Sequence, residues 1–294
     1  MKNNKQINSK KCAIALLARD CENNLKKNIK EVEKLIPLFE TCDIVVIEND
    51  SIDNTKQILN EWNRNNKNVV VISMDNIFSS SDKTGAGLSR IERMCFYRNK
   101  YMEYFKQQNK NYDYLIVVDA DLDYFSSSGI IKAIKNSQFE WEALFANGRF
   151  YSKICGLHFL GKYYDNYAYV PYKSDTIHLD DWQMKQNNDY ISFILNIKKY
   201  VHCQSAFGGL AIYKYEKVRD FIYNTIQNEK SKNNKVLCEH IVFNNKLDKS
   251  KLYIAKNIKV LYQKQPLFIY IKSILNIQTI QVLFYKLINK KHFF

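Results

Sequence analysis

The sequence predicts an α/β fold with a mainly parallel sheet flanked by helices. Short apolar segments alternate with amphipathic stretches through the first half of the 294-residue chain, which is the pattern of βαβ units. Hydrophobic residues make up 46% of the chain and charged residues 25%, as in ordinary soluble domains. This composition excludes disordered, collagen-like and coiled-coil classes, and the length allows one large α/β unit or two small domains.

Four strands are expected in this first half, and a helix precedes each of the last three where the apolar residues repeat at helical spacing. The expected strands are Cys12–Ala18, Asp43–Ile47, Val69–Ser73 and Tyr114–Val118. The helical repeats are Leu25, Ile29, Val32 and Ile36, then Ile58, Leu59 and Trp62, then Ile91, Met94, Tyr101 and Phe105. In such folds ligands bind beyond the carboxyl ends of the strands, so the residues that directly follow each strand are the candidates for a site.

The net charge of +14 would suit a nucleic acid, an anionic membrane surface or a phosphorylated ligand. Lysine and asparagine recur together along the whole chain, so a compositional bias spread over the surface is the simpler explanation. Seven cysteines without a Cys-x-x-Cys pair argue against a disulfide framework or zinc finger. We therefore expect a cytoplasmic protein, with peripheral membrane contact as an open alternative and without a transmembrane helix.

The strongest chemical signal follows the fourth expected strand, where Asp119, Asp121 and Asp123 alternate. Carboxylates gathered at a strand end repel one another unless a cation neutralises them, and a hard divalent ion that also binds a diphosphate would do so. Mn²⁺ or Mg²⁺ is the expected cofactor. Loop capping is the alternative explanation, since a bare Asp-x-Asp is common.

A second polar turn follows the strand that ends at Ile47. Asp53 or Ser51 could simply cap the next helix, while Glu48 and Asp50 could face a ribose or a base. Both roles can hold at once.

Three further polar residues need an explanation. Arg98 falls in the middle of a buried helical stripe, where an unpaired guanidinium would be costly, so it needs an anion. That anion is either a buried carboxylate or a diphosphate. His202 and His240 are candidates for a third metal ligand or for contact with the leaving phosphate, although lone histidines are more often structural.

These motifs together carry a resemblance. The segment from Ile47 to Thr55 resembles the second-strand motif of GT-A glycosyltransferases, and Val118–Asp121 resembles their Asp-x-Asp strand. Over roughly residues 12–245 the sequence is most similar to the fungal capsule-associated α-1,3-mannosyltransferases, glycosyltransferase family 69. The motifs that carry this similarity are Glu48-Asn49-Asp50-Ser51, Arg93, Arg98-Asn99, Asp121 and Cys238-Glu239-His240. The resemblance implies a GT-A, Rossmann-like catalytic domain.

It also implies roles for single residues. Ala18, Arg19 and Asp20 would line the nucleotide, and Glu48 and Asp50 would lie near base and ribose. Asp121 would ligate the metal directly, Asp119 would hold the ribose or the metal through water, and Asp123 is an additional carboxylate.

On the acceptor side the resemblance is less complete. Gly208-Gly209 lies where a glycine pair often precedes the acceptor-facing loop, and Glu239-His240 replaces a pair of acidic residues. If the enzyme inverts the anomeric centre, Glu239 is the candidate base; if it retains it, as the resemblance implies, no dedicated base is needed.

The expected function is a metal-dependent transfer of a sugar from GDP-mannose or a UDP-sugar to a carbohydrate or glycoconjugate, in glycan, capsule or lipo-oligosaccharide synthesis. One alternative is a haloacid dehalogenase-type phosphohydrolase, which would need Asp119 as nucleophile and prefers Thr or Val where Asp123 stands. The other is a basic nucleic-acid-binding module, but no clustered basic helix supports it, and we expect no nucleic acid partner.

We expect a catalytic domain over residues 1–265, with a nucleotide-binding half at about 12–125 and an acceptor half at about 139–265, and a C-terminal helical extension over 266–294. In that extension Tyr270, Ile274, Ile277, Ile280, Phe284 and Leu287 form an apolar stripe with lysines beside it. Docking on the catalytic domain is the more frequent explanation of such a stripe, and a membrane-surface helix is the alternative.

Overall fold

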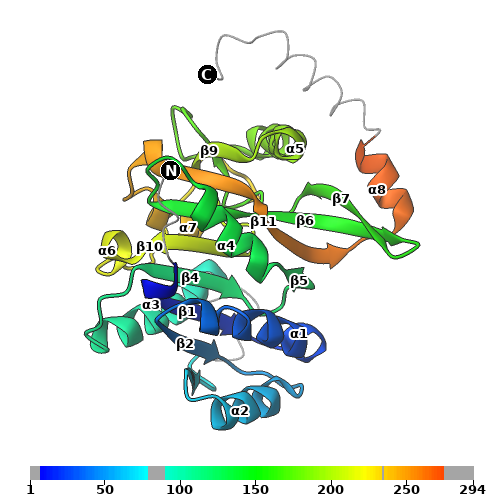
Figure 1. The fold of residues 1–294 in the computed structure, drawn as a ribbon. Helices are drawn as coiled ribbons and strands as arrows, with labels where there is room; N and C mark the ends of the chain where they lie inside the picture. Colours follow the sequence, from blue (N-terminus) through cyan, green and yellow to red (C-terminus); the bar gives the residue numbers. More distant parts are fainter. Residues whose placement is uncertain (1–6, 79–89, 234, 275–294) are drawn as a thin grey trace.

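The computed structural model describes residues 7–78, 90–233 and 235–274, and its centre is an eleven-stranded sheet (Figure 1). Its first part contains four parallel strands, in the spatial order β3 (Val69–Ser73), β2 (Thr41–Glu48), β1 (Lys11–Ala18) and β4 (Tyr114–Asp119). These are the four strands that the sequence predicts, and their parallel order confirms the α/β expectation.

The second part of the sheet is mixed. Strand β10 (Leu210–Lys214) runs antiparallel to β4 and begins directly after the Gly208-Gly209 pair. The sheet then continues through β6 (Ala143–Ile154), β11 (Leu252–Lys264), β9 (Tyr200–Ser205) and β8 (Val170–Pro171). Two further strands pair off this path, β5 (Tyr124–Phe125) with β11 and β7 (Leu157–Tyr163) with β6.

Helices lie against both faces of this sheet. They are α1 (Glu22–Glu33), α2 (Thr55–Asn65), α3 (Arg90–Gln107), α4 (Ser127–Asn136), α5 (Asp181–Ile197), α6 (Tyr215–Val218), α7 (Glu239–Asn244) and α8 (Leu267–Ile274), with 3₁₀ turns at Ile7–Ser9, Ile36–Leu38 and Lys249–Lys251. Helix α1 buries Leu25, Ile29 and Val32 as predicted, but it ends before Ile36. Pro37 directly follows Ile36, and its ring and missing N–H would disrupt an α-helix that continued through this position.

The alternation of side chains along β1 produces two apolar layers, one on each face of the sheet. Ala13 and Ala15 belong to one buried cluster, while Cys12, Ile14 and Leu16 belong to the other. A strand that is buried on both faces reads as a continuous apolar run, which is why its sequence is so uniform.

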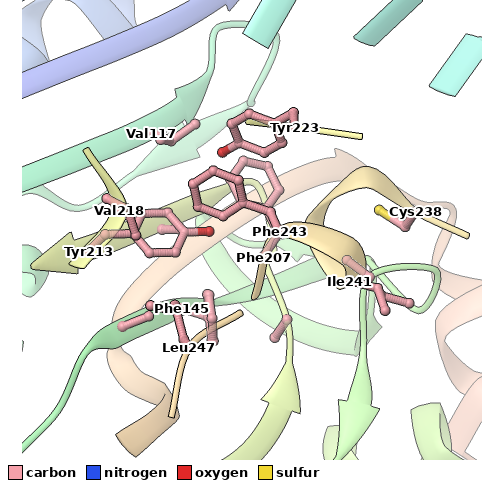
Figure 2. Packing of buried hydrophobic residues seen from close by; sticks show 14 of the residues in the cluster. Val117, Phe145, Phe207, Tyr213, Val218, Tyr223, Cys238, Ile241, Phe243 and Leu247 are labelled. Carbon is pink, nitrogen blue, oxygen red and sulfur yellow. The ribbon is translucent and has the colours of Figure 1, made fainter. Parts of the chain in front are cut away.

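One of these layers fixes helix α7, on which a predicted site residue lies. Phe243 of α7 stacks on Tyr223 with ring centroids 4.1 Å apart and meets Tyr213 of β10 edge on at 5.4 Å (Figure 2). Burial of each such ring contributes about 1.5–3 kcal/mol. This packing sets the position of Glu239, the first residue of α7.

The expected C-terminal helix begins at Leu267 as α8 and contacts β6 and β7, where Tyr270 meets Phe159 edge on with ring centroids 6.1 Å apart. The remainder of the predicted apolar stripe, from Ile277 onward, lies outside the described residues. Within the described ranges, no helix combines the length and apolar character that a membrane span requires.

Candidate functional site

The carboxyl ends of β1, β2 and β4 meet at one edge of the sheet and open onto a cleft of about 320 Å³, here called the strand-end cleft. Its lining from these strand ends consists of Ala18, Arg19, Asp20, Asn49, Asp50, Asp119 and Asp121. Helix α3 adds Arg90, Arg93 and Tyr97. Most of the residues predicted to lie around a nucleotide are therefore brought together here.

The polar turn after β2 is held by local hydrogen bonds. The backbone N–H of Ser51 donates to the Glu48 carboxylate at 2.9 Å, and the Ser51 hydroxyl accepts the N–H of Asp20 at 3.1 Å. Asp50 adopts a positive φ of 49° and accepts the N–H of Asn76 at 2.8 Å. Glu48 is completely buried and does not line the cleft, whereas Asp50 does. Glu48 therefore supports the turn that presents Asp50.

Asp53 links the starts of two helices, although it is not the N-cap residue that the capping hypothesis expected, since Asn54 holds that position in α2 and Cys21 in α1. Its carboxylate accepts the N–H of Glu22 at the start of α1 at 3.0 Å and the N–H of Thr55 at the start of α2 at 2.9 Å. Glu22 in turn accepts the N–H of Asn54 at 2.9 Å. Each of these bonds satisfies a backbone N–H at a helix start, and together they fix the turns after β1 and β2 relative to each other.

The three aspartates at the carboxyl end of β4, of which Asp119 is the last residue of the strand, occupy two different environments. Asp119 and Asp121 line the cleft, and burial raises the pKa of both carboxyls, that of Asp119 to about 7. The Asp123 carboxylate accepts hydrogen bonds from the Asn24 amide at 2.8 Å and the Tyr151 hydroxyl at 3.0 Å. Asp123 thus joins α1 to β6 and does not line the cleft.

Arg98 is 1% exposed and lies between two carboxylates. Its Nη2 is 3.2 Å from Asp119 Oδ1, and its Nε is 3.0 Å from Glu239 Oε1. The guanidinium also lies 5.1 Å from the centre of the Phe207 ring. Carboxylates therefore supply the anion that the sequence required, while Nη1 is buried without a hydrogen-bond partner in the described part of the chain.

A second cavity of about 470 Å³ adjoins the first, here called the loop-side cavity. The two cavities share Arg90, Met94, Asp119 and Asp121. The second half of the chain contributes Tyr164, Asp165, Phe207, Glu239, His240 and Tyr262. Asp119 and Asp121 consequently lie where the two cavities meet.

The loop-side cavity depends on a close approach at Gly208. This residue has a φ of +68°, and a Cβ there would lie 2.5 Å from the carbonyl oxygen of Ala146. Its N–H donates to the Asp165 carboxylate at 2.9 Å, and burial raises the pKa of that carboxyl to about 6. Beside it, the rings of Tyr164 and Tyr262 stack with centroids 3.9 Å apart.

The two candidate histidines lie in different places. His240 is buried, stacks on Phe207 with centroids 3.8 Å apart and lines the loop-side cavity. Burial, together with the nearby Arg98, holds the pKa of His240 well below its usual range, so the ring is neutral. His202 stacks on Tyr172 and lines a separate cavity.

Sequence reasoning missed several lining residues, among them Tyr164, Asp165 and Tyr262. The aromatic-rich segment around Tyr163-Tyr164 had indicated the region, but no spacing pattern marks Asp165, which follows that pair directly. Tyr262 belongs to β11 and reaches the cavity only because β11 pairs with β6 in the second part of the sheet.

The donor set at the junction fits a hard divalent cation. Asp119 and Asp121 present carboxylate oxygens, the ligand type that Mg²⁺ and Mn²⁺ favour. In the described ranges there is no cluster of three or more His, Cys, Asp or Glu side chains that could hold a metal alone. Two carboxylates with the remaining positions left to a ligand are what an ion bridging protein and diphosphate requires.

Comparison with known proteins identifies relatives of this arrangement. The family model described as Cryptococcal mannosyltransferase 1 matches residues 11–252. No curated protein matches the sequence. The mannosyltransferase PcManGT from Pyrobaculum calidifontis, solved with GDP-Man and Mn²⁺, is 10% identical with a TM-score of 0.50, over 86% of this chain and 56% of that one.

Two other solved structures are less similar in fold. TarS 1–349 from S. aureus with UDP-GlcNAc is 12% identical with a TM-score of 0.45, over 87% of this chain and 59% of that one. GalNAc-T7 with UDP, GalNAc and Mn²⁺ is 15% identical with a TM-score of 0.48, over 87% and 44%. The chain thus spans roughly half the length of these proteins, and the likeness to PcManGT confirms the expected fold.

Proposed function

The chain belongs to the Cryptococcal mannosyltransferase 1 family, and from that premise we propose that it is a metal-dependent glycosyltransferase. It would move a sugar from a nucleoside diphosphate sugar, GDP-mannose or a UDP-sugar, to a carbohydrate or glycoconjugate acceptor. The observation that carries this proposal is the position of Asp119 and Asp121 at the junction of two adjoining cavities. One cavity is available for a nucleotide and the other for an acceptor.

On the nucleotide side, the proposal gives each residue a task that its position supports. Arg19 and Asp50 line the strand-end cleft beyond β1 and β2, where base and ribose would lie. Arg98 lines the loop-side cavity and not the strand-end cleft, but it is paired with Asp119 where the two cavities meet, and its Nη1, which lacks a partner in the described chain, could donate there to a phosphate oxygen. Asp119 and Asp121 would hold Mn²⁺ or Mg²⁺, and a bound ion of this kind neutralises charge on a departing diphosphate.

On the acceptor side, three carboxylates from the second half of the chain line the loop-side cavity, Asp165, Asp181 and Glu239. Of these, Asp181 accepts hydrogen bonds from Ser231 Oγ and Asn233 Nδ2. Glu239 is paired with the Arg98 guanidinium, whereas Asp165 accepts the backbone N–H of Gly208. An inverting transfer needs a base for the acceptor hydroxyl, and Glu239 is the residue that the sequence proposes for it. Comparing the transfer rates of Glu239→Gln and Asp165→Asn at saturating donor separates the two, because only the loss of a base lowers turnover without lowering donor affinity.

The test of the proposed function is a thermal-shift screen of GDP-, UDP- and CDP-sugars, each with and without Mn²⁺. A ligand that binds only the folded state raises stability by mass action, by about 2.7 kcal/mol at a hundred times its Kd. We expect one nucleotide class to raise the Tm, and to do so only with the metal. A screen in which no nucleotide raises the Tm would contradict the proposal.

The family match gives no support to the two other functions that the sequence left open. It spans residues 11–252, which include the strand that ends at Asp119. A phosphohydrolase nucleophile would also need to be free to attack, whereas Asp119 is paired with Arg98.

A further inference from the structure

Six large apolar side chains are exposed at one end of the molecule, and they are here called the hairpin–α8 patch. Leu157 and Phe159 lie on β7 just after the turn of the β6–β7 hairpin, and they are 66% and 36% exposed. Leu267, Phe268, Ile269 and Ile271 of α8 are 42%, 69%, 38% and 45% exposed. Single exposed apolar residues need no explanation, but a gathering of this kind marks an interaction surface.

The two parts of the patch are distant in sequence but adjacent in space. Helix α8 contacts both β6 and β7, and the Phe159 and Tyr270 rings are in contact. Figure 1 shows α8 beside the β6–β7 hairpin, at the end of the molecule away from α6. At the hairpin turn, Cys155 and Gly156 have positive φ angles of 47° and 80°, and a Cβ on Gly156 would meet nothing within 4 Å. The patch therefore protrudes and ends in an open turn. This shape suits insertion into a flat surface better than the binding of a peptide, which needs a groove.

The charged residues on the two segments that carry the patch are all basic, and an acidic residue that contacts both segments is Asp123, which accepts the Tyr151 hydroxyl and the backbone N–H of Lys264. Neither residues 150–164 nor residues 252–274 contain an aspartate or glutamate. Lys153, Lys264 and Lys272 are exposed within these two segments. The patch thus combines exposed apolar side chains with lysines and has no acidic residue on either of its two segments.

We propose that the hairpin–α8 patch docks the protein on an anionic lipid bilayer. Apolar side chains on a protruding element enter the interface between headgroups and acyl chains, and lysines beside them are attracted to anionic lipids. This surface goes beyond the proposed function, with which it is compatible. Two residues of the loop-side cavity connect it to the patch: Tyr164 directly follows β7, and Tyr262 belongs to β11. The five residue steps from Phe159 to Tyr164 span about 17 Å in an extended strand.

The test is co-sedimentation of the full chain with phosphatidylcholine vesicles, with and without phosphatidylglycerol, at low and moderate salt. We expect binding to the anionic vesicles, and weaker binding as salt rises. Phe268→Ser and Leu157→Ser should each reduce the partition coefficient about tenfold, because each removes a large apolar side chain from the interface. Lys272→Gln should reduce it about fivefold.

Matched controls come from exposed residues outside the patch. Ile222→Ser removes an apolar side chain that is 63% exposed just after α6, and Lys230→Gln removes an exposed lysine. Both should bind vesicles like the wild type. Equal losses in the controls, or no vesicle binding by the wild-type chain, would overturn the proposal, as would a dimer that the patch substitutions dissociate. The nucleotide-dependent rise in Tm should be the same in all variants, so failure of the membrane proposal is distinguishable from failure of the proposed function.

Discussion

The strand-end cleft and the loop-side cavity adjoin each other, yet they are built in different ways. The first is lined on one side by residues at or just after the ends of β1, β2 and β4, whose positions follow from sheet register and short turns, and on the other side by residues of α3. The second collects side chains from segments around residues 164, 207, 239 and 262. Arg98 joins the two, because it pairs with Asp119, which lines both cavities, and with Glu239, which lines only the second. Residues at strand ends are positioned by the sheet itself. Residues from separate loops need a side-chain interaction such as the Arg98 ion pairs to hold them together.

The largest expected effect therefore comes from removing that link. Arg98→Met leaves the Asp119 and Glu239 carboxylates in the interior without their cation, and breaking a buried pair in this way costs about 3–5 kcal/mol. Urea unfolding of the ligand-free protein measures this change. Arg93→Met, on the same helix but only partly buried, should change the stability by less than about 1 kcal/mol.

The double variant Arg98→Met with Glu239→Gln shows whether the missing charge compensation is the cause. It should recover part of the lost stability, because the amide is neutral. If Arg98→Met were no more costly than Arg93→Met, the buried pair would not be what holds the two cavities together.

The second prediction concerns the glycines of the second half. Gly208→Ala should cost about 2–4 kcal/mol, because it combines a strained positive φ with a clash against the carbonyl of Ala146. Gly156→Ala shares the positive φ but has open space around it, so it should cost only about 1–2 kcal/mol. Equal Tm values for the two variants would contradict the close contact between Gly208 and the carbonyl group of Ala146.

The smallest effect is a pH dependence from Asp165. The pKa of this carboxyl is raised from 3.8 to about 6 in the fold, so its protonation favours the folded state. This stabilisation is complete below about pH 4 and is lost as the pH rises through about 6, which amounts to about 1–2 kcal/mol for a group that is not fully buried.

Asp165→Asn should remove that part of the pH dependence of unfolding in metal-free buffer, whereas Asp175→Asn, at an exposed carboxylate, should leave it unchanged. A pH profile identical in the wild type and Asp165→Asn would contradict the assignment.

The same contrast explains how much the sequence could predict. The four parallel strands follow from apolar periodicity, and the polar residues at their ends pointed to Asp50, Asp119 and Asp121, whereas Arg19 was expected only through the resemblance. Glu48 was expected near the ribose, but its side chain is completely buried beneath the turn, a distinction that periodicity cannot make. Asp165 and Tyr262 escaped because their positions depend on the mixed pairing of β6, β10 and β11, which no local pattern encodes.

The metal and donor site itself is tested most directly by titration calorimetry of the nucleoside diphosphate identified in the screen, with and without Mn²⁺. The comparison is between wild type, Asp121→Asn and Asp123→Asn, because only Asp121 lines the cavities while Asp123 bonds to Asn24 and Tyr151. We predict that Asp121→Asn loses at least about a hundredfold of the Mn²⁺-dependent affinity, more than loss of an indirect ligand partner costs. Asp123→Asn should keep it. Mn²⁺-dependent affinity retained in a folded Asp121→Asn protein would contradict the site described above.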